Sequence, residues 1–531
     1  MEYEWIVTSL NNFLWIGITF VLGLFAKQIG LPPMVGFLAA GFVLSTQNIV
    51  DRELLSRMAD LGITLLLFTI GLKINVKNLV RPQVWAVSSI HAIITVAFFG
   101  LVIYALALLS TPLFEGLTIE NALLIGFALS FSSTVFVIKA MESKGEMDSF
   151  HGRIAIGVLI IQDIFAVVFL AVSANKVPSI WSLGLLLFIP MRHLLFWLIE
   201  RVGHGELLIV YGFLLAIGGA EIFELVGVKG DLGALILGMM FATHFKAEEL
   251  VKTMLGFKDL FLLGFFLSIG LNGQPTLGVI LTALLITPFV MFKGALFFAL
   301  FVKFKLRART SLLSTISLSN YSEFGLIVIA ICVANGWVES QWLTIMALSI
   351  AFSFVFSALV NKQANNLYTQ NRSFWKKFQT KQRLPNDKIL DIGSAQVAVI
   401  GMGSVGTGAY DQLIKKYDNH VVGVDIYPDT VLDQQKQGRH VLLGDPTDAD
   451  FWDRVNQSHQ LKLVLLTLPQ FSSSMAVIEQ LHESKFNGKI AATAKFADEI
   501  EQLNAAGVDT VFNMYTEAGA GFAAHVVNHT D

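Results

Sequence analysis

Two adjacent polar residues, Gln162 and Asp163, stand in the middle of an otherwise apolar stretch, IAIGVLIIQDIFAVVFL, at residues 154–170. An ionised carboxylate at the centre of a bilayer costs roughly 2.5–3.5 kcal/mol on insertion scales, so such a residue normally faces a polar cavity or an ion pathway. Neighbouring helical positions point about 100° apart, so both side chains can border one cavity. Gln162 can coordinate or donate, whereas only Asp163 can exchange a proton, so we predict that Asp163 is the titrating residue of a functional site.

Two further segments at membrane depth are rich in small polar residues. They read GFALSFSSTVFVIK at residues 126–139 and STISLSNYSEFGLI at residues 314–327. Ser, Thr and Asn can satisfy backbone groups that are freed where a membrane helix is interrupted, but they also pack between intact helices. The residues alone favour the two explanations about equally. Two interrupted helices would be typical of an inverted-repeat transporter, in which half-helix ends meet near the midplane.

Two more charged residues lie within apolar segments. Glu323 belongs to the second polar segment, and Lys293 lies in TPFVMFKGALFF. A carboxylate is favoured near the N-terminus of a half-helix, whereas a lysine inside the membrane needs an acidic partner or a wet cavity. We expect Lys293 to pair with Asp163 when the cation site is empty. The alternative is that Lys293 reaches the interface, since it is only ten residues from Lys303.

The elements that must hold these residues are membrane-spanning helices. Hydrophobic residues make up 54% of the 531 positions, and the mean hydropathy of +0.64 is well above that of soluble proteins. A spanning helix needs about 20 mostly apolar residues, and residues 1–360 contain thirteen candidates. The candidates begin near Trp5, Pro33, Leu54, Val84, Thr118, Gly152, Ile180, Leu207, Asp231, Gly256, Leu277, Thr310 and Gln341.

Lysines and arginines are divided unevenly between the loops that connect these spans. One set of loops holds most of them, Arg153 and Arg307 included, and the other offers little beyond Arg52, Lys176 and Lys229. The basic side is expected to be cytoplasmic, and an odd number of spans then places the polar C-terminal region in the cytoplasm. The net charge of -3, without a dense basic stripe, argues against a nucleic-acid partner. No His or Cys spacing suggests a structural metal site.

A polar linker at residues 361–393 leads into a C-terminal domain at residues 394–531, which opens QVAVIGMGSVGTGAYDQLIKKY. A β-rich run is followed by glycines at 401, 403 and 406, by a helical pattern and by a second strand that ends at Asp425. That carboxylate stands where a residue that holds ribose hydroxyls is expected. Strands and helices then alternate, which predicts a doubly wound, Rossmann-like sheet that binds a nucleotide. The competing interpretation is the same fold with a degenerate, empty site.

With these residues in view, the chain resembles the second group of monovalent cation/proton antiporters, and most closely the Kef-type potassium efflux systems. The resemblance covers nearly the whole length, and a Gln-Asp pair combined with a fused RCK (TrkA-N) domain is its most specific mark. It also rests on the segments GFALSFSSTVFVIK, HGRIAIGVLIIQD, GALILGMMFATHF, FKDLFLLGFFLSIGLN and SNYSEFG.

The resemblance implies a fold and a set of site residues. The fold is a polytopic helical membrane domain with inverted repeats and crossed broken helices, followed by the Rossmann-like RCK domain. Asp163 matches the ion and proton carrier, and the other residues implied at the transport site are Gln162, Ser133, Thr134, Lys293 and Glu323. The residues implied at the nucleotide site are Gly401, Met402, Gly403, Ser404, Val405, Gly406, Asp425, Ile426 and Asp445.

The resemblance also implies ligands, partners and a location. The RCK domain would bind an adenine nucleotide, AMP or NAD(H), and the transported ion would be K⁺ or Na⁺. The protein would be a homodimer in the bacterial inner membrane with its RCK domain in the cytoplasm. Glutathione or its adducts and an ancillary cytoplasmic subunit are further partners found with some members.

Four functions compete at this point. The leading one is a potassium/proton antiporter that works by alternating access, and the second is a sodium/proton antiporter of the same fold. A third is a potassium channel gated by the RCK domain, although a channel filter needs no proton carrier. A membrane-tethered dehydrogenase is the fourth, but the polar region lacks a substrate domain and an evident acid/base pair, so we expect no enzyme.

Overall fold

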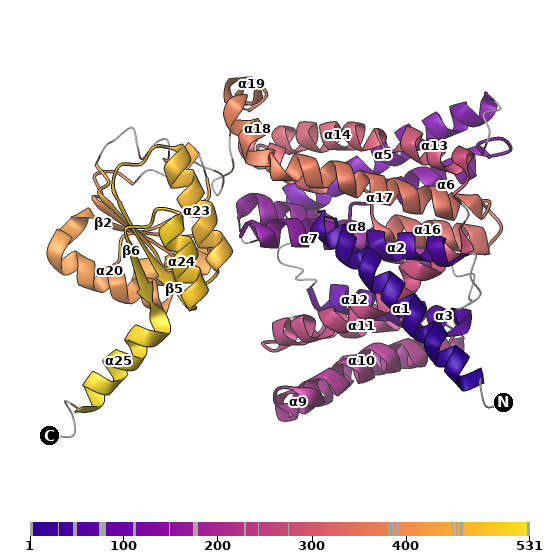
Figure 1. Cartoon of the computed structure of the whole chain (residues 1–531), viewed down its shortest axis with the longest axis horizontal. Helices are drawn as coiled ribbons and strands as arrows, with labels where there is room; N and C mark the ends of the chain where they lie inside the picture. The colour runs from indigo at the N-terminus through magenta and orange to yellow at the C-terminus, as the bar shows by residue number, and fades with distance from the viewer. Residues whose placement is uncertain are drawn as a thin grey trace. The chain divides into compact units, whose positions relative to one another are not determined.

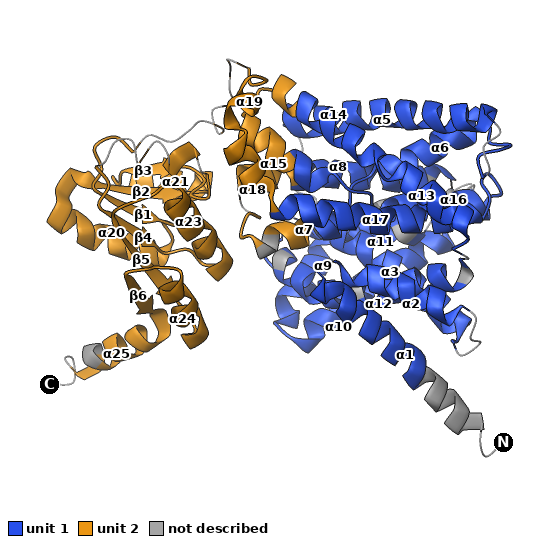
Figure 2. Ribbon diagram, turned by 45° about the horizontal axis from the view of Figure 1, so that its top comes forward, with its two compact units in different colours: residues 1–136, 156–300, 315–362 blue, residues 137–155, 301–314, 363–531 orange. Residues whose placement is uncertain are grey.

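The computed structural model describes residues 4–527 except residues 30, 46–49, 74–80, 110–112, 148, 174–178, 228–229, 243, 274, 381, 383, 385–386, 388–391, 449, 453–454 and 456–459. The chain divides into two compact units (Figure 2). The first comprises residues 1–136, 156–300 and 315–362, and the second comprises residues 137–155, 301–314 and 363–531. The second unit therefore contains two short segments of the helical region besides the expected linker and C-terminal domain.

All of the regular structure described in residues 1–376 is helical (Figure 1). They are α1 (Glu4–Gln28), α2 (Pro33–Leu44), α3 (Arg52–Lys73), α5 (Pro82–Leu108), α6 (Ile119–Ser130), α7 (Thr134–Ser143), α8 (Phe150–Ser173), η1 (Ile180–Leu187), α9 (Phe188–Val202), α10 (Glu206–Leu225), α11 (Gly230–Phe241), α12 (Ala247–Asn272), α13 (Leu277–Ile286), α14 (Phe289–Lys303), α15 (Ala308–Leu318), α16 (Glu323–Ala334), α17 (Gln341–Lys362), α18 (Ala364–Gln370) and α19 (Arg372–Lys376).

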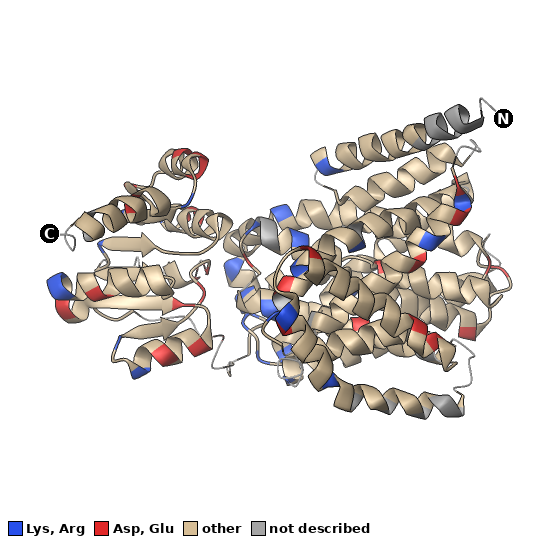
Figure 3. Cartoon of the chain, turned by 90° about the horizontal axis from the view of Figure 1, so that it is seen from below, with Lys and Arg blue, Asp and Glu red and all other residues tan. Residues whose placement is uncertain are grey.

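Eight helices or helix pairs among the described residues are long and apolar enough to cross a membrane, or nine when the bent pair α15 and α16 counts as one span. Shorter apolar helices lie at Phe13–Gln28, Pro33–Leu44 and Leu232–Phe241. Each of the thirteen predicted spans coincides with a helix or a helix pair, but the number that cross the membrane remains a prediction. The bulk of the helical region carries few charges, and most of its Lys and Arg gather at one end (Figure 3).

Both polar segments interrupt their helices, so the interruption explanation is correct. Residues 131–133 are non-helical between α6 and α7, and α15 and α16 meet at a bend of 43° across the break that follows Leu318. Each second half begins with a side-chain cap, because the Ser133 hydroxyl accepts from Phe136 N and the Ser322 hydroxyl accepts from Phe324 N. A cap of this kind satisfies an orphan N–H at a helix start.

A second set of helices packs backbone against backbone through glycines. A Cβ on any of these glycines would fall within 3 Å of the neighbouring helix backbone. Such small residues let membrane helices approach closely. The close approaches join α1 to α2 at Gly36, α2 to α12 at Gly41 and Gly270, α3 to α12 at Gly62, α3 to α11 at Gly71 and Gly238, and α10 to α11 at Gly233.

The C-terminal domain is a six-stranded, wholly parallel sheet in the order β3-β2-β1-β4-β5-β6. Its strands are β1 (Val397–Ile400), β2 (Val421–Asp425), β3 (Val441–Leu443), β4 (Leu463–Leu466), β5 (Lys489–Ala494) and β6 (Thr510–Asn513). Its helices are α20 (Ser404–Tyr417), η3 (Asp418–His420), α21 (Pro428–Lys436), α23 (Phe471–Glu483), α24 (Ala497–Ala505) and α25 (Met514–Val527). The predicted doubly wound fold is confirmed.

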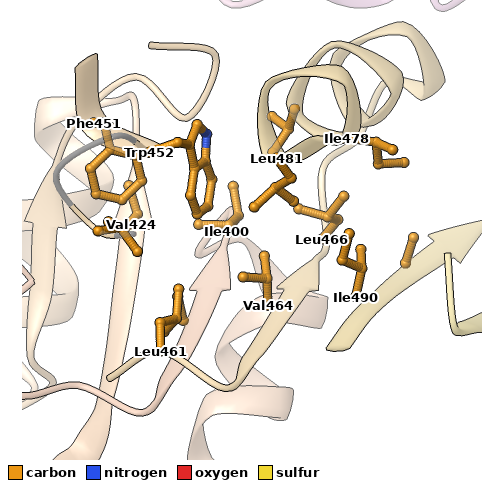
Figure 4. Packing of buried hydrophobic residues seen from close by; sticks show 14 of the residues in the cluster. Ile400, Val424, Phe451, Trp452, Leu461, Val464, Leu466, Ile478, Leu481 and Ile490 are labelled. Carbon is orange, nitrogen blue, oxygen red and sulfur yellow. The ribbon is translucent and has the colours of Figure 1, made fainter. Parts of the chain in front are cut away.

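The core of this domain lies against both faces of the central strands. Figure 4 shows Ile400, Val464 and Leu466 packed beneath Trp452 and the α23 residue Leu481. All five side chains are almost fully buried. Strand order reverses between β1 and β4, and ligands of doubly wound sheets bind outside the carboxyl ends of the strands at that point.

Candidate functional site

The two helix interruptions lie against each other and share hydrogen bonds. Ser133 N donates to the Asn320 side-chain oxygen at 2.7 Å, and the Ser132 hydroxyl donates to the Leu318 carbonyl at 2.8 Å. All four residues are buried. The carbonyl and amide groups that the breaks release are thus satisfied across the crossing, as membrane-depth backbone requires. The family resemblance implied this crossing of the two segments.

Gln162 braces the first interruption. Its side-chain oxygen accepts from Ser132 N at 2.9 Å, and its side-chain nitrogen donates to the Ser130 carbonyl at 3.3 Å. The amide therefore spans the non-helical turn from one side to the other and satisfies two freed backbone groups. In this conformation the side-chain oxygen and nitrogen of Gln162 both bond to backbone groups.

Asp163 lies beside the start of the second half-helix. The Thr134 hydroxyl is 3.4 Å and 3.3 Å from the two Asp163 carboxylate oxygens, and Thr134 is the first residue of α7. Asp163 is 2% exposed. The positive end of the α7 dipole favours a negative charge at this position, so the geometry offers an anionic, buried oxygen site next to a hydroxyl.

Lys293 has two backbone partners that the sequence did not predict. Its ammonium donates to the Phe131 carbonyl and, at 2.8 Å, to the Asn320 carbonyl. These oxygens lie just past the C-termini of α6 and α15, so the cation sits at the negative ends of two helix dipoles. Both of these partners are backbone carbonyls, and the pair of Lys293 with Asp163 stays a prediction. The snorkelling alternative is wrong, because Lys293 is fully buried.

Glu323 opens the second half-helix, α16, and is 1% exposed. The Ser322 hydroxyl lies 3.5 Å from one carboxylate oxygen, and the other oxygen has no hydrogen-bond partner in the part of the chain that the structure describes. A buried carboxyl oxygen without a donor is costly, and the α16 dipole offsets part of that cost when the group is charged. The crossing therefore holds two carboxyl groups near two helix N-termini and one ammonium near two C-termini.

The sequence reasoning missed three residues that hold the crossing together. Asn320 links the two interruptions, Ser353 accepts from Tyr321 N at 3.0 Å, and the Ser357 hydroxyl donates to the Ser319 carbonyl. A signal was present in α17, where polar residues recur every fourth position and so share one face. The recurring residues are Ser349, Ser353, Ser357 and Asn361.

The glycine-rich loop of the C-terminal domain joins β1 to α20, as predicted. Gly401 has a φ of +92°, which favours glycine. A Cβ on Gly406 would collide with the Gly401 carbonyl oxygen. Gly403, Ser404 and Val405 are exposed at the start of α20, so their N–H groups can meet a phosphate.

The acidic residues predicted for the nucleotide lie at the carboxyl ends of neighbouring strands. Asp425 ends β2 and accepts from Met402 N at 2.7 Å and from Tyr427 N at 2.9 Å. Asp445 follows β3 and accepts from Thr447 N at 2.9 Å. A carboxylate oxygen with one such bond can still accept from a ribose hydroxyl.

Two of the remaining predicted nucleotide residues, Met402 and Ile426, have backbone groups in hydrogen bonds at this edge of the sheet. The Met402 side chain is buried, so only its main chain faces the site. The Ile426 carbonyl accepts from an Arg153 guanidinium nitrogen at 3.1 Å. Exposed N–H groups, a glycine that no larger residue could replace and two carboxylates at one sheet edge together fit the phosphates and ribose of a nucleotide.

Comparisons with known proteins agree with this geometry. The sodium/hydrogen exchanger transmembrane family model matches residues 16–362, and the TrkA-N domain model matches residues 397–514. The chain is 24% identical to the putative cation/proton antiporter YbaL of Escherichia coli, over 93% of this chain and 92% of the relative. It is also 24% identical to the glutathione-regulated potassium-efflux system protein KefC of Escherichia fergusonii, over 94% of this chain and 82% of that protein.

Among solved structures, the sodium proton antiporter MjNhaP1 of Methanocaldococcus jannaschii matches 70% of this chain and 99% of its own, with 14% identity and a TM-score of 0.48. The family assignment rests on the sequence model, which covers well over half of the 531 residues. The protein belongs to the sodium/hydrogen exchanger family of membrane transporters, with a TrkA-N domain behind its exchanger region.

Proposed function

We propose that the protein exchanges potassium for protons across a bacterial inner membrane by alternating access. The observation that carries this proposal is a buried carboxylate, Asp163, at the crossing of two interrupted helices in a member of the sodium/hydrogen exchanger family. Potassium is chosen over sodium because a relative that aligns along most of the chain is named a potassium-efflux protein, and another is named a cation/proton antiporter.

Asp163 would couple the two fluxes through mutually exclusive binding. An ionised carboxylate attracts a monovalent cation, and protonation removes the charge that attracts it. The Thr134 hydroxyl, about 3.3 Å from the carboxylate, is placed to add a neutral oxygen ligand. One titrating group then suffices for exchange, and no second acid is required.

Gln162, Ser133, Lys293 and Glu323 would keep the crossing in shape around the carrier. The Gln162 side chain and the Ser133 hydroxyl bind freed backbone groups, and Lys293 balances the two helix C-termini. Glu323 would hold the N-terminal end of α16 and keep its unbonded oxygen available to the pathway. Lys293 and Glu323 each lie at the helix end whose partial charge is opposite to their own.

The two modes of helix packing suggest the moving parts. Glycine contacts bind α1, α2, α3, α10, α11 and α12 into one set. Hydrogen-bonded polar side chains, together with a close contact of Gly325 with the α6 backbone, hold α6, α7, α15, α16 and α17 around the carrier. A rocking movement of the second set against the first would expose Asp163 to each side in turn.

The TrkA-N domain would regulate this exchange by binding an adenine nucleotide, AMP or NAD(H), at the glycine-rich loop. We further propose a homodimer with functional boundaries at residues 1–360, 361–393 and 394–531. Glutathione or its adducts and an ancillary subunit remain candidate partners, since one relative is named a glutathione-regulated system.

The test is proton movement in proteoliposomes under an imposed pH gradient, with potassium or sodium added in turn. Wild-type protein should release protons on potassium addition, and Asp163→Asn should abolish that release. If Asp163→Asn has the melting temperature and gel-filtration profile of the wild type, its fold is intact. Proton release on addition of sodium but not potassium would show that the transported ion is sodium. Potassium leakage without proton movement would show that the protein is a channel and not an antiporter.

A further inference from the structure

The second unit contains a buried group of ion pairs, here called the Arg307 cluster, formed by Arg307 with Asp387, Asp448 and Asp450. The Arg307 side chain contacts Asp387 at 3.1 Å, Asp450 at 3.5 Å and Asp448. Its backbone N–H also donates to Asp387 at 2.5 Å. Arg307 is 5% exposed and the three carboxylates are similarly buried, so water screens these charges poorly.

The cluster holds the loop that follows β3, which also carries the nucleotide residue Asp445. Asp445 accepts from the N–H and the hydroxyl of Thr447. Arg309 donates to the Thr447 carbonyl at 2.8 Å, one residue before Asp448. A displacement of Asp445 by a bound ribose would therefore be transmitted within three residues to groups that Arg307 and Arg309 bind.

The two arginines stand at the start of a helix that ends at the transport crossing. Arg307 directly precedes α15, and Arg309 is its second residue. The helix ends at Leu318, whose carbonyl takes part in the crossing. Because an α-helix rises about 1.5 Å per residue, the Arg307 cluster lies roughly 15 Å along α15 from the crossing.

A second contact joins the nucleotide site to the helix of the carrier itself. Arg153 of α8 donates to the carbonyl of Ile426, the residue after Asp425. Asp163 lies ten residues further along the same helix, again about 15 Å away. Arginines at the two helices that lead to the transport site thus bind the loop after β2, which directly follows Asp425, and the loop after β3, which contains Asp445.

The charges of the Arg307 cluster explain why its ion pairs are hard to separate. Burial by itself lowers the pKa of the Arg307 guanidinium, but Asp448 and Asp387 raise it above its ordinary value. Burial raises the pKa of the Asp448 carboxyl, and Arg307 and Arg309 more than reverse this effect. Both groups therefore stay charged throughout the physiological pH range, and parting them would leave buried charges unpaired.

We propose that Arg307 is a positioning residue that couples nucleotide occupancy of the TrkA-N domain to the transport helices, acting through Asp448 and the loop of Asp445. This proposal rests on the proposed function for its transport part. Binding of a nucleotide at Asp445 and Asp425 shifts the two arginine-bound loops, and α15 and α8 move with them. The coupling must be reciprocal, since both sites bias one connected element.

The experiment compares full-length wild type with Asp448→Asn and Arg307→Lys, which keep the shape or the charge but weaken the pair. Arg201→Lys, an exposed arginine that stacks on Trp197 of α9, is the matched control. Ion exchange is measured in proteoliposomes with AMP or NADH on the side that carries the TrkA-N domain. Nucleotide affinity is measured on the same purified proteins by calorimetry.

In wild type and Arg201→Lys, one of the two nucleotides should change the exchange rate by about fivefold or more. In Asp448→Asn and Arg307→Lys the same nucleotide should change the exchange rate by less than about twofold. The Kd of the nucleotide should shift by about fivefold from the wild-type value. If Arg307→Lys fails to fold, Asp448→Asn carries the test, because Asp387 still pairs with Arg307 in it.

An unchanged effect of the nucleotide on the exchange rate, with an unchanged Kd, in Asp448→Asn would overturn the coupling, as would wild type that binds neither nucleotide or binds one without any change in exchange. If wild type does not exchange ions at all, the proposed function fails. The Kd arm then still tests whether the Arg307 cluster positions the nucleotide loop.

Discussion

At the scale of single residues, the transport crossing matches each charge to a helix end. Lys293 lies at the C-termini of α6 and α15, and Asp163 and Glu323 lie at the N-termini of α7 and α16. Each placement lowers the cost of a buried charge because the exposed backbone groups of a helix end carry the opposite partial charge. The lysine is therefore a structural counter-charge for the crossing in this conformation.

Lys293→Met tests this role. The substitution keeps the aliphatic length but removes both donors, which leaves two buried carbonyls unsatisfied at roughly 1–3 kcal/mol each. We expect a clear fall in the melting temperature of the detergent-solubilised protein. Lys303→Met, at the exposed end of the same helix, should leave the melting temperature nearly unchanged. Equal melting temperatures for the two variants would show that Lys293 does not brace the crossing.

A glycine substitution tests the nucleotide loop in the same way. Gly406→Ala places a methyl group against the Gly401 carbonyl, so the loop must open. We expect AMP or NADH affinity to fall by at least about tenfold. Gly408→Ala, in the same helix with nothing near its Cβ, should retain the wild-type affinity. Tight binding by Gly406→Ala would place the nucleotide elsewhere.

At the scale of elements, two kinds of packing hold the membrane helices together. Around the carrier, side chains from α8, α14 and α17 satisfy the backbone of the interruptions. Away from it, glycines let α10 and α11 or α2 and α12 touch directly. The first arrangement places polar groups at the midplane, and the second gives close van der Waals packing without any polar group.

Gly233→Ala should disturb the glycine-packed set. Its methyl group would overlap the carbonyl of Gly219 on α10, and backbone cannot yield as a side chain can. We expect a loss of roughly 1–3 kcal/mol from overpacking, seen as a lower melting temperature. Gly218→Ala has only one side-chain atom near its Cβ, at 3.9 Å, and should be neutral or slightly stabilising. A neutral Gly233→Ala would mean that the two helices do not pack this closely.

Sequence patterns predicted the elements better than their partners. The glycine-rich loop and the order of strands and helices in the C-terminal domain follow from local composition and spacing, and the structure confirms them. For the two polar segments, composition favoured interruption and intact packing equally, and the structure shows the interruption. The partners of Lys293 could not be predicted, because backbone carbonyls have no signature in a sequence. Asn320 was missed for the same reason, since its role depends on which distant segment lies opposite.

At the scale of the whole molecule, the helices that carry Asp163 and Leu318 begin at arginines that contact loops of the TrkA-N domain. Asp163 and Arg153 share α8, and the crossing residue Leu318 and Arg309 share α15. A sequence-based domain boundary at residue 360 separates these functions, but the compact units place residues 137–155 and 301–314 with the TrkA-N domain. Long-range contacts of this kind are set by tertiary structure, which local composition does not encode.

The most direct measurement of the central claim is the apparent KM for potassium as a function of pH on the side of potassium addition, with the opposite side held constant. If proton and cation compete for Asp163, KM should rise by up to about tenfold for each unit of falling pH once the carboxylate is protonated, at a constant maximal rate. A KM that is independent of pH, with a maximal rate that falls instead, would contradict competition at a single carrier.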